Sequence, residues 1–296
     1  MTNHAMTLHD TLQRFVFEHA PVRGEIVHLG TTWRAVLERH DYPPALRSLL
    51  GELMAAAALL ASTLKFSGTM TMQMQGSGPV RLLVVECTSD LTLRATAKWD
   101  GALFDMPLKE LLGAGRFVIT IDPLEGKHSY QGIVELEGGT VAQVLEHYMA
   151  GSEQLQTRLW LAVDGRQASG LLLQRLPAPE STDEDAWDRA VQLASTIARD
   201  ELLQLSAQQI IHRLYHAEDI RVFRVKPVSF RCSCSRENVT AMLRTLGYGE
   251  VRSVLEERGA VEVHCEFCNR LYLFDRVDAE QVFAAEVITG IEPTRH

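Results

Sequence analysis

Two close pairs of cysteines near the C-terminus constrain this chain more than any other feature. They lie in the motifs Cys232-Ser-Cys234 and Cys265-Glu-Phe-Cys268, with thirty residues between the pairs. Zinc takes four sulfur ligands in a tetrahedron, and a tight turn between paired cysteines can aim two thiolates at one ion. The spacing therefore predicts one zinc ion per chain, bound by Cys232, Cys234, Cys265 and Cys268.

Other uses of these cysteines are disfavoured. A disulfide framework is typical of exported proteins, and the stretch Met1–Asp10 has neither the apolar core nor the cleavage pattern of a signal peptide. A thioredoxin-like redox pair needs a βαβ setting that Cys265–Cys268 lacks. Four buried free thiols in two tight pairs would be a coincidence. We therefore expect a reducing, cytoplasmic location and a metal site.

The segment 232–296 depends on that metal. A chain of about 65 residues has a marginal hydrophobic core. A structural zinc site contributes roughly 10–16 kcal/mol to folding in small domains, whereas closing the thirty-residue loop costs on the order of 3 kcal/mol plus a constant. Removal of zinc should unfold the module.

The rest of the chain mixes strands and helices without the regular alternation of parallel βα units. This pattern predicts an α+β fold with a largely antiparallel sheet. The apolar run Leu53–Ala61 lies inside an expected helix from Pro43 to Lys65 and is too short for a bilayer, so we expect it to be buried. The expected strands are 14–18, 22–29, 68–75, 79–87, 91–98, 115–121, 129–136, 156–163 and 168–175, with further helices from Thr31 or Thr32 to His40 and from Thr140 to Ala150.

Chain-breaking residues divide the sequence into three parts. Pro177–Asp185 is acidic and rich in residues that interrupt helices and strands, which predicts a domain boundary there. We expect an N-terminal core domain over 1–177, a helical linker over 178–231 and the zinc module over 232–296.

The linker carries an apolar stripe that must be buried in the folded state. Its members recur three or four residues apart, as on one face of a helix, and a second short helix is expected from Ser206. The zinc module and the N-terminal sheet are the surfaces available to cover it. The stripe comprises Trp187, Val191, Ala194 and Ile197.

The zinc module has its own helix and strand signals. Ser235 is suited to cap a helix that Gly247 ends, and a second helix is expected to stop at Gly259. Strands are expected around 261–263 and 271–274, followed by a final helix capped by Asp278.

Charge and motifs disfavour several functions. The chain has a formal net charge of −9, and residues 232–296 contain seven Arg, no Lys and eleven Asp or Glu. This acidity disfavours nucleic-acid binding, which needs cations against phosphates. The sequence has no P-loop, dinucleotide fingerprint or serine-nucleophile motif, and four cysteines leave no open position on the metal. We expect no enzyme activity and neither a nucleic-acid nor a membrane partner.

The chemistry of the cysteines permits a redox switch but does not require one. Peroxide or hypochlorite that oxidises one ligand weakens the site, and a neighbouring thiol can then close a disulfide. Cys232–Cys234 and Cys265–Cys268 are close enough for local bridges, although the smaller ring would be strained. Most four-cysteine zinc sites are only structural, and on spacing alone that alternative stays open.

The chain resembles a known family along nearly its whole length. Phe230–Arg236, Val263–Asn269, and Tyr272 with Phe274 are similar to the C-terminal signature of the 33-kilodalton heat-shock chaperone family. The segments Val22–Leu29 and Lys65–Pro79 are similar to the family's N-terminal segments.

The resemblance implies an ATP-independent, redox-regulated holdase. In such proteins the reduced, zinc-bound form is inactive and cytoplasmic. Oxidation releases zinc and forms disulfides within each pair, here Cys232–Cys234 and Cys265–Cys268. The module and linker then unfold, unfolded client proteins bind to the exposed apolar surface, and the active form tends to form a homodimer. Two alternatives carry a purely structural zinc: an enzyme of unknown type, and a zinc-ribbon adaptor.

Other conspicuous residues have plain structural interpretations. His264 is expected to be a spectator beside a complete tetrahedron, and Cys87 an inert core thiol. Alternating methionines at positions 70, 72 and 74 share one face of a strand, where core packing is favoured over an adaptable client surface. For Arg231, Arg236 and Arg270, electrostatic support of thiolates and ordinary solvation remain equal alternatives.

Overall fold

The computed structural model describes residues 10–124, 128–177, 183 and 185–289, with side chains described as far as residue 284. The chain divides into two compact units, which meet in the sequence between Arg231 and Cys232. The expected boundary after residue 177 adjoins residues 178–182, which lie outside the described residues. The three-part division therefore stays a prediction.

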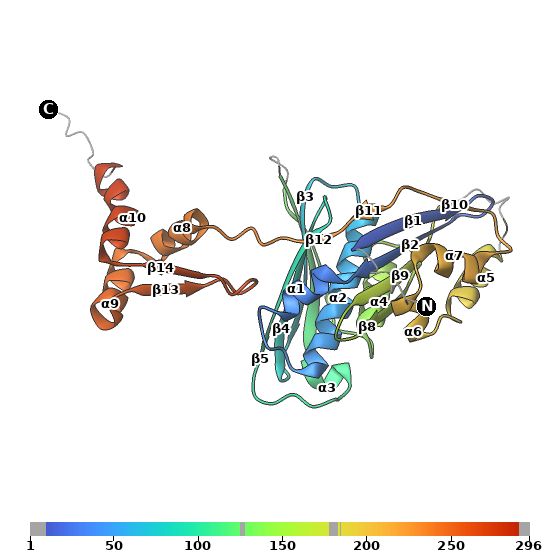
Figure 1. The fold of residues 1–296 in the computed structure, drawn as a ribbon, viewed down its shortest axis with the longest axis horizontal. Helices are drawn as coiled ribbons and strands as arrows, with labels where there is room; N and C mark the ends of the chain where they lie inside the picture. The colour runs from blue at the N-terminus through green and yellow to red at the C-terminus, as the bar shows by residue number, and fades with distance from the viewer. Residues whose placement is uncertain (1–9, 125–127, 178–182, 184, 290–296) are drawn as a thin grey trace, which may run out of the picture. The chain divides into compact units, whose positions relative to one another are not determined.

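The described part of the first unit contains two six-stranded sheets (Figure 1). Sheet A has the order β10-β1-β2-β9-β8, with β11 also paired to β1, and sheet B has the order β12-β5-β4-β3-β6-β7. The described pairings are antiparallel, apart from β12 with β5. The α+β prediction is confirmed, although one sheet was expected instead of two. The strands are β1 (Thr11–Phe17), β2 (Val22–Leu29), β3 (Gly68–Gly76), β4 (Val80–Thr88), β5 (Thr92–Trp99), β6 (Gly115–Pro123), β7 (Tyr130–Glu135), β8 (Thr157–Val163), β9 (Ala168–Arg175), β10 (Ile220–Val222), β11 (Lys226–Pro227) and β12 (Ser229–Phe230).

Helix α2 (Pro44–Thr63) explains why there are two sheets. It packs against strands of both, and residues of both share its core cluster. Its apolar window is long enough to cross a membrane but is 72% buried within the protein, which confirms the prediction of a core helix. The alternating methionines of β3 and the Cys87 thiol are fully buried in the same cluster. Core packing is therefore confirmed for them, and the client-surface alternative for the methionines is wrong in this state.

The other helices of the first unit differ in whether the capping residue is adjacent to the helix in the sequence or distant from it. Thr140 caps α4 (Val141–Gly151) by accepting the N–H of Gln143, as predicted. Helix α1 (Thr31–Leu37) is shorter than expected and is not capped by its own threonines. The Asp10 carboxylate, from the start of β1, accepts the N–H groups of Gly30 and Thr32 instead. The short helix α3 (Leu108–Leu112) was not predicted.

Three short helices cover the outer face of sheet A. They are α5 (Ala186–Ala194), α6 (Arg199–Gln204) and α7 (Ala207–Tyr215), and we call them the connector. Trp187 and Ala194 are buried against the sheet, and Val191 and Ile197 are half-buried there. The predicted apolar stripe is thus packed, and sheet A covers it.

A strap of residues 220–231 follows the connector and pairs with both sheets. Its strands β10 and β11 pair with β1, and β12 pairs with β5. Val228 enters the main core, and the Arg231 N–H donates to the carbonyl of Leu93. The strap therefore ends, firmly paired, one residue before Cys232.

The second unit is a small module with its own apolar cluster. Ser235 caps α8, and Gly247 and Gly259 follow the two predicted helices, as expected. The final helix begins earlier than predicted. Asp275 accepts the N–H of Asp278, whose carboxylate returns to the N–H of Asp275, so Asp275 is the cap. The elements are α8 (Arg236–Leu246), α9 (Tyr248–Arg258), β13 (Val261–His264), β14 (Leu271–Phe274) and α10 (Arg276–Thr289).

Candidate metal centre

Two local structures position the four cysteines. Cys232 and Cys234 lie in the extended segment before α8, where Ser235 already adopts the cap conformation. Cys265 and Cys268 lie in the turn between β13 and β14. In that turn the Cys265 N–H donates to the carbonyl of Arg270, and the Asn269 N–H donates to the carbonyl of Cys265. Asn269 has a φ of 56°, a left-handed conformation that asparagine tolerates better than most residues.

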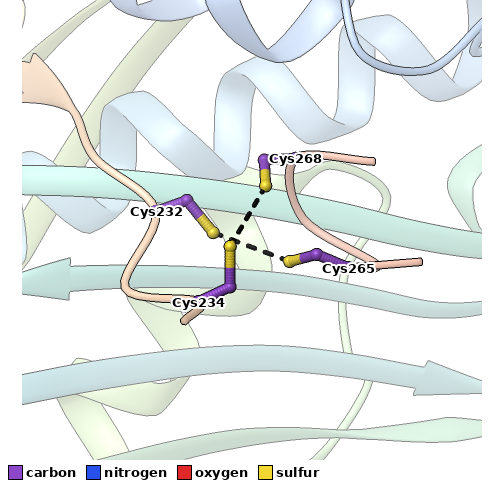
Figure 2. Close-up of side chains that lie close together, drawn as sticks. All are labelled: Cys232, Cys234, Cys265 and Cys268. Carbon is purple, nitrogen blue, oxygen red and sulfur yellow. Dashed lines mark hydrogen bonds between the residues drawn. The ribbon is translucent and has the colours of Figure 1, made fainter. Parts of the chain in front are cut away.

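The four sulfur atoms converge on one point (Figure 2). They all lie within 4.8 Å of one another. Two close contacts join the two pairs: the Sγ atoms of Cys232 and Cys265 are 3.6 Å apart, and those of Cys234 and Cys268 are 3.4 Å apart. Sulfurs at about 2.3 Å from a tetrahedral ion would be about 3.8 Å apart. This donor set therefore fits a metal ion held between the two halves of the module.

The thiols are electrostatically unequal. Burial raises the pKa of Cys234, but a hydrogen bond from the Tyr272 hydroxyl, 3.1 Å from Sγ, and contacts with the other sulfurs lower it to about 7 overall. Burial and the proximity of Cys234 raise the pKa of Cys268 to about 12. Of these two thiols, Cys234 therefore becomes a thiolate more readily. A bound cation would favour deprotonation of every thiol in the cluster.

Tyr272 is the contributor that spacing alone did not reveal. It lies on β14 opposite Val263 of β13, with its ring buried and its hydroxyl aimed at Cys234. The alternation of Leu271, Tyr272, Leu273 and Phe274 indicates which of them share a face. Which face turns toward the sulfurs depends on how β14 pairs.

The arginines near the cysteines contact other groups. Arg236 forms an ion pair with Asp278 at 2.8 Å, donates to the carbonyl of Leu273 and lies over the Phe274 ring. Arg270 lies over the ring of Tyr272. Arg236 therefore joins α8 to β14 and α10. His264 is exposed on β13 and lies outside the sulfur cluster.

A cavity of about 210 Å³ in the first unit bears on the enzyme alternative. Its walls are mainly apolar, and the Glu153 carboxylate at its edge accepts the hydroxyls of Tyr130 and Tyr148. A deep polar pocket would have favoured an enzyme, and this cavity does not have that character.

Comparison with known proteins identifies the family. The family model described as "Hsp33 protein" matches residues 10–275, a range that contains all four cysteines. The chain belongs to the Hsp33 family. The resemblance seen in the sequence is thereby confirmed, and a four-cysteine cluster compatible with metal binding and redox chemistry lies within a chaperone family.

Similar proteins match nearly the whole length of this chain. A "33 kDa chaperonin" of Methylobacillus flagellatus is 51% identical over 98% of this chain and 100% of that protein. One from Chromobacterium violaceum is 50% identical over 98% of this chain and 99% of that protein. The crystal structure of a 33 kDa chaperonin from Thermotoga maritima matches with a TM-score of 0.81 and 24% identity, covering 95% of this chain and 100% of that one. The structural match supports the fold.

Proposed function

We propose that this chain is an oxidant-activated, ATP-independent holdase, which binds unfolding client proteins and prevents their aggregation. The convergence of four sulfurs within 4.8 Å, inside an Hsp33 family chain, is the observation that carries the proposal. Absence of catalysis, a cytoplasmic location, a homodimeric active form and the lack of nucleic-acid and membrane partners remain part of the proposal.

In the reduced state Cys232, Cys234, Cys265 and Cys268 would hold one zinc ion. Bound zinc would keep the thiols deprotonated and cross-link the two halves of the module. The protein supplies the Ser235 cap, the β13–β14 turn and the Tyr272 hydroxyl, which fix the sulfurs in place.

Oxidation by peroxide is the activating step. Peroxide converts one thiolate to a sulfenic acid, and a second thiol displaces water to form a disulfide. Each disulfide consumes two thiols and one H₂O₂ and yields two waters. We assign the bridges to Cys232–Cys234 and Cys265–Cys268. Although these two close contacts join cysteines of different pairs, they depend on the folded module, whereas the two sulfurs within each pair stay close in the chain after the module loosens.

The strap is the covalent route from the module to the connector. Its last backbone hydrogen bond, from Arg231 to Leu93, lies next to Cys232. Disorder beginning at Cys232 can therefore fray β12 and then β11 and β10. Loss of β10 removes an edge strand beside the surface that the connector covers. Trp187, Val191, Ala194 and Ile197, with the sheet face beneath them, would then be available to clients through hydrophobic burial.

One experiment tests the proposal directly. Reduced, zinc-loaded protein is treated with peroxide while zinc release, disulfide mapping and suppression of client aggregation are followed together without ATP. We expect about one equivalent of zinc to leave before activity rises, and within-pair disulfides in the active protein. Chaperone activity that is equal in the reduced state, or oxidation with zinc release and no activity, would overturn the holdase proposal and leave a structural zinc site.

A further inference from the structure

Two histidines on connector helix α7 lie one helical turn apart on its exposed side. His212 and His216 are four residues apart, both are exposed, and their ring centroids are 6.1 Å apart. Residues at this spacing are neighbours on a helix surface, and two histidines so placed can bind one metal ion.

Packing fixes this pair on the solvent side. Ile211, Leu214 and Tyr215 are buried against sheet A, and the Tyr215 hydroxyl donates to the carbonyl of Ala190. Because α7 cannot rotate without exposing these side chains, both imidazoles stay on its outer face. Within the described part of the chain, neither imidazole has a hydrogen-bond or ion-pair partner, so their nitrogens are available as ligands.

The electrostatic surroundings of the two histidines are compatible with a bound cation. His212 belongs to the last turn of α7 and His216 is its C-cap, where the helix dipole is negative. The neighbouring Arg213 is engaged by Glu201 and by Thr196, which reduces its repulsion.

We infer that His212 and His216 form a second metal site, a two-histidine clip for a borderline divalent cation such as Zn²⁺, Ni²⁺ or Cu²⁺. Imidazole suits these ions, and water completes the coordination of a two-ligand site. The clip joins successive turns of a nine-residue helix that is marginal by itself, so the ion stabilises α7. If the proposed holdase mechanism holds, the clip opposes release of the connector and slows activation.

Nickel is the probe, because it binds imidazole without oxidising thiols. Untagged, reduced, zinc-loaded protein is titrated with Ni²⁺ while histidine NMR signals and amide exchange of α7 are measured. We expect selective broadening of His212 and His216. Protection of α7 should rise about 100-fold when free nickel is 100 times its dissociation constant. His216→Ala should weaken binding by about tenfold or more, because the second ligand acts at high effective concentration.

A variant with the same number of histidines tests the spacing. His216→Ala combined with Ala217→His moves the second ligand one residue along, off the shared face, and should bind as weakly as His216→Ala. His147→Ala, at an exposed histidine of α4, should bind like the wild type. Equal binding by the wild type and the shifted variant, or unchanged exchange of α7 when nickel is bound, would overturn the inference. Lack of holdase activity would overturn the proposed function and leave these binding results unaffected.

Discussion

The two units differ in how they are held together. In the first unit, α2 and both sheets share one large core, and the connector adds a second cluster on sheet A. In the module, one small cluster spans three helices and a two-stranded sheet, and Cys234 and Cys265 are packed at its edge. The first unit can be stabilised by apolar burial alone, whereas the module has one small core with its four clustered cysteines beside it.

This difference suits a switch. A unit whose stability comes from one ion can be unfolded by chemistry at that ion, without unfolding the main core of its neighbour. All four tryptophans, at positions 33, 99, 160 and 187, lie in the first unit. Tryptophan fluorescence therefore reports on the first unit alone, which makes the comparison testable.

The largest expected effect is loss of the metal. Cys232→Ser and Cys265→Ser should each abolish stoichiometric zinc and remove most of the roughly 10–16 kcal/mol that a structural zinc contributes. Regional hydrogen exchange should show residues 232–289 unprotected and the connector less protected, with the amides of α2 and β3 nearly unchanged.

Cys87→Ala is the matched control for this prediction. It removes the buried fifth thiol, whose pKa is raised by burial, and should leave about one zinc per chain. A metal-free module that keeps its amide protection, or equal loss of protection in both units, would refute the division.

A smaller effect concerns pH and the interface between sheet A and the connector. Burial lowers the pKa of His28 to about 4, although the carbonyls of Leu205 and Leu202 partly offset this. Between pH 6.5 and 4, His28 binds a proton in the unfolded chain but not in the folded chain, so its contribution to the free energy of unfolding falls as pH falls. The full loss is about 3 kcal/mol, from 2.5 pKa units at 1.36 kcal/mol each. The His28 contribution therefore weakens the contact between sheet A and the connector as pH falls.

His28→Gln isolates this contribution. Burial raises the pKa values of Glu25 and Glu52 to about 7, which stabilises the folded state as pH falls and opposes the histidine. The measurement is thus the difference in unfolding free energy between wild type and variant, from urea titrations followed by tryptophan fluorescence at pH 6.5 and 4.5. The variant should lose less stability on acidification. Identical losses would mean that His28 does not control this interface.

A double substitution in the connector should have the next largest effect. Val191→Ser with Ile197→Ser removes half-buried apolar groups from the contact with sheet A and should destabilise the connector by about 2 kcal/mol. That raises the open population roughly 30-fold, so the reduced protein should suppress client aggregation without oxidant. The measurement is light scattering of a thermally unfolding client.

Gln192→Ser, on the exposed side of the same helix, is its control and should stay inactive until oxidised. If the reduced double variant fails to suppress client aggregation, as the control does, and peroxide activates it normally, the connector is only a tether.

What the sequence could predict follows from how local each interaction is. The cysteine cluster is set by two short motifs, and the caps at Ser235, Ser206 and Thr140 act within three residues, so all of these could be predicted from nearby residues in the sequence. The Asp10 carboxylate caps α1 from about twenty residues away and was missed.

Distant pairing explains the other omissions. The strands β10, β11 and β12 have two or three residues each, too few for a periodic signal, and their partners β1 and β5 lie far away in the sequence. The second sheet was missed for a related reason. Strand patterns show which residues are buried but not which strands pair, and only the packing of α2 against both sheets separates them.

The smallest expected effect decides what Arg236 does for the module. If its charge supports the thiolates, Arg236→Lys should change nothing, because lysine keeps the charge. If its role is the hydrogen bond to Leu273 and the contact with the Phe274 ring, 4.2 Å away, lysine should lose both. We expect the second result, with zinc passing to a chelator about fivefold faster at unchanged stoichiometry, as for one lost hydrogen bond. Arg252→Lys is the control, since Arg252 forms an exposed ion pair with Glu256 on α9. Normal transfer by Arg236→Lys combined with fast transfer by Arg236→Gln would instead assign the role to charge, and the module would then depend even more on its metal site than on packing.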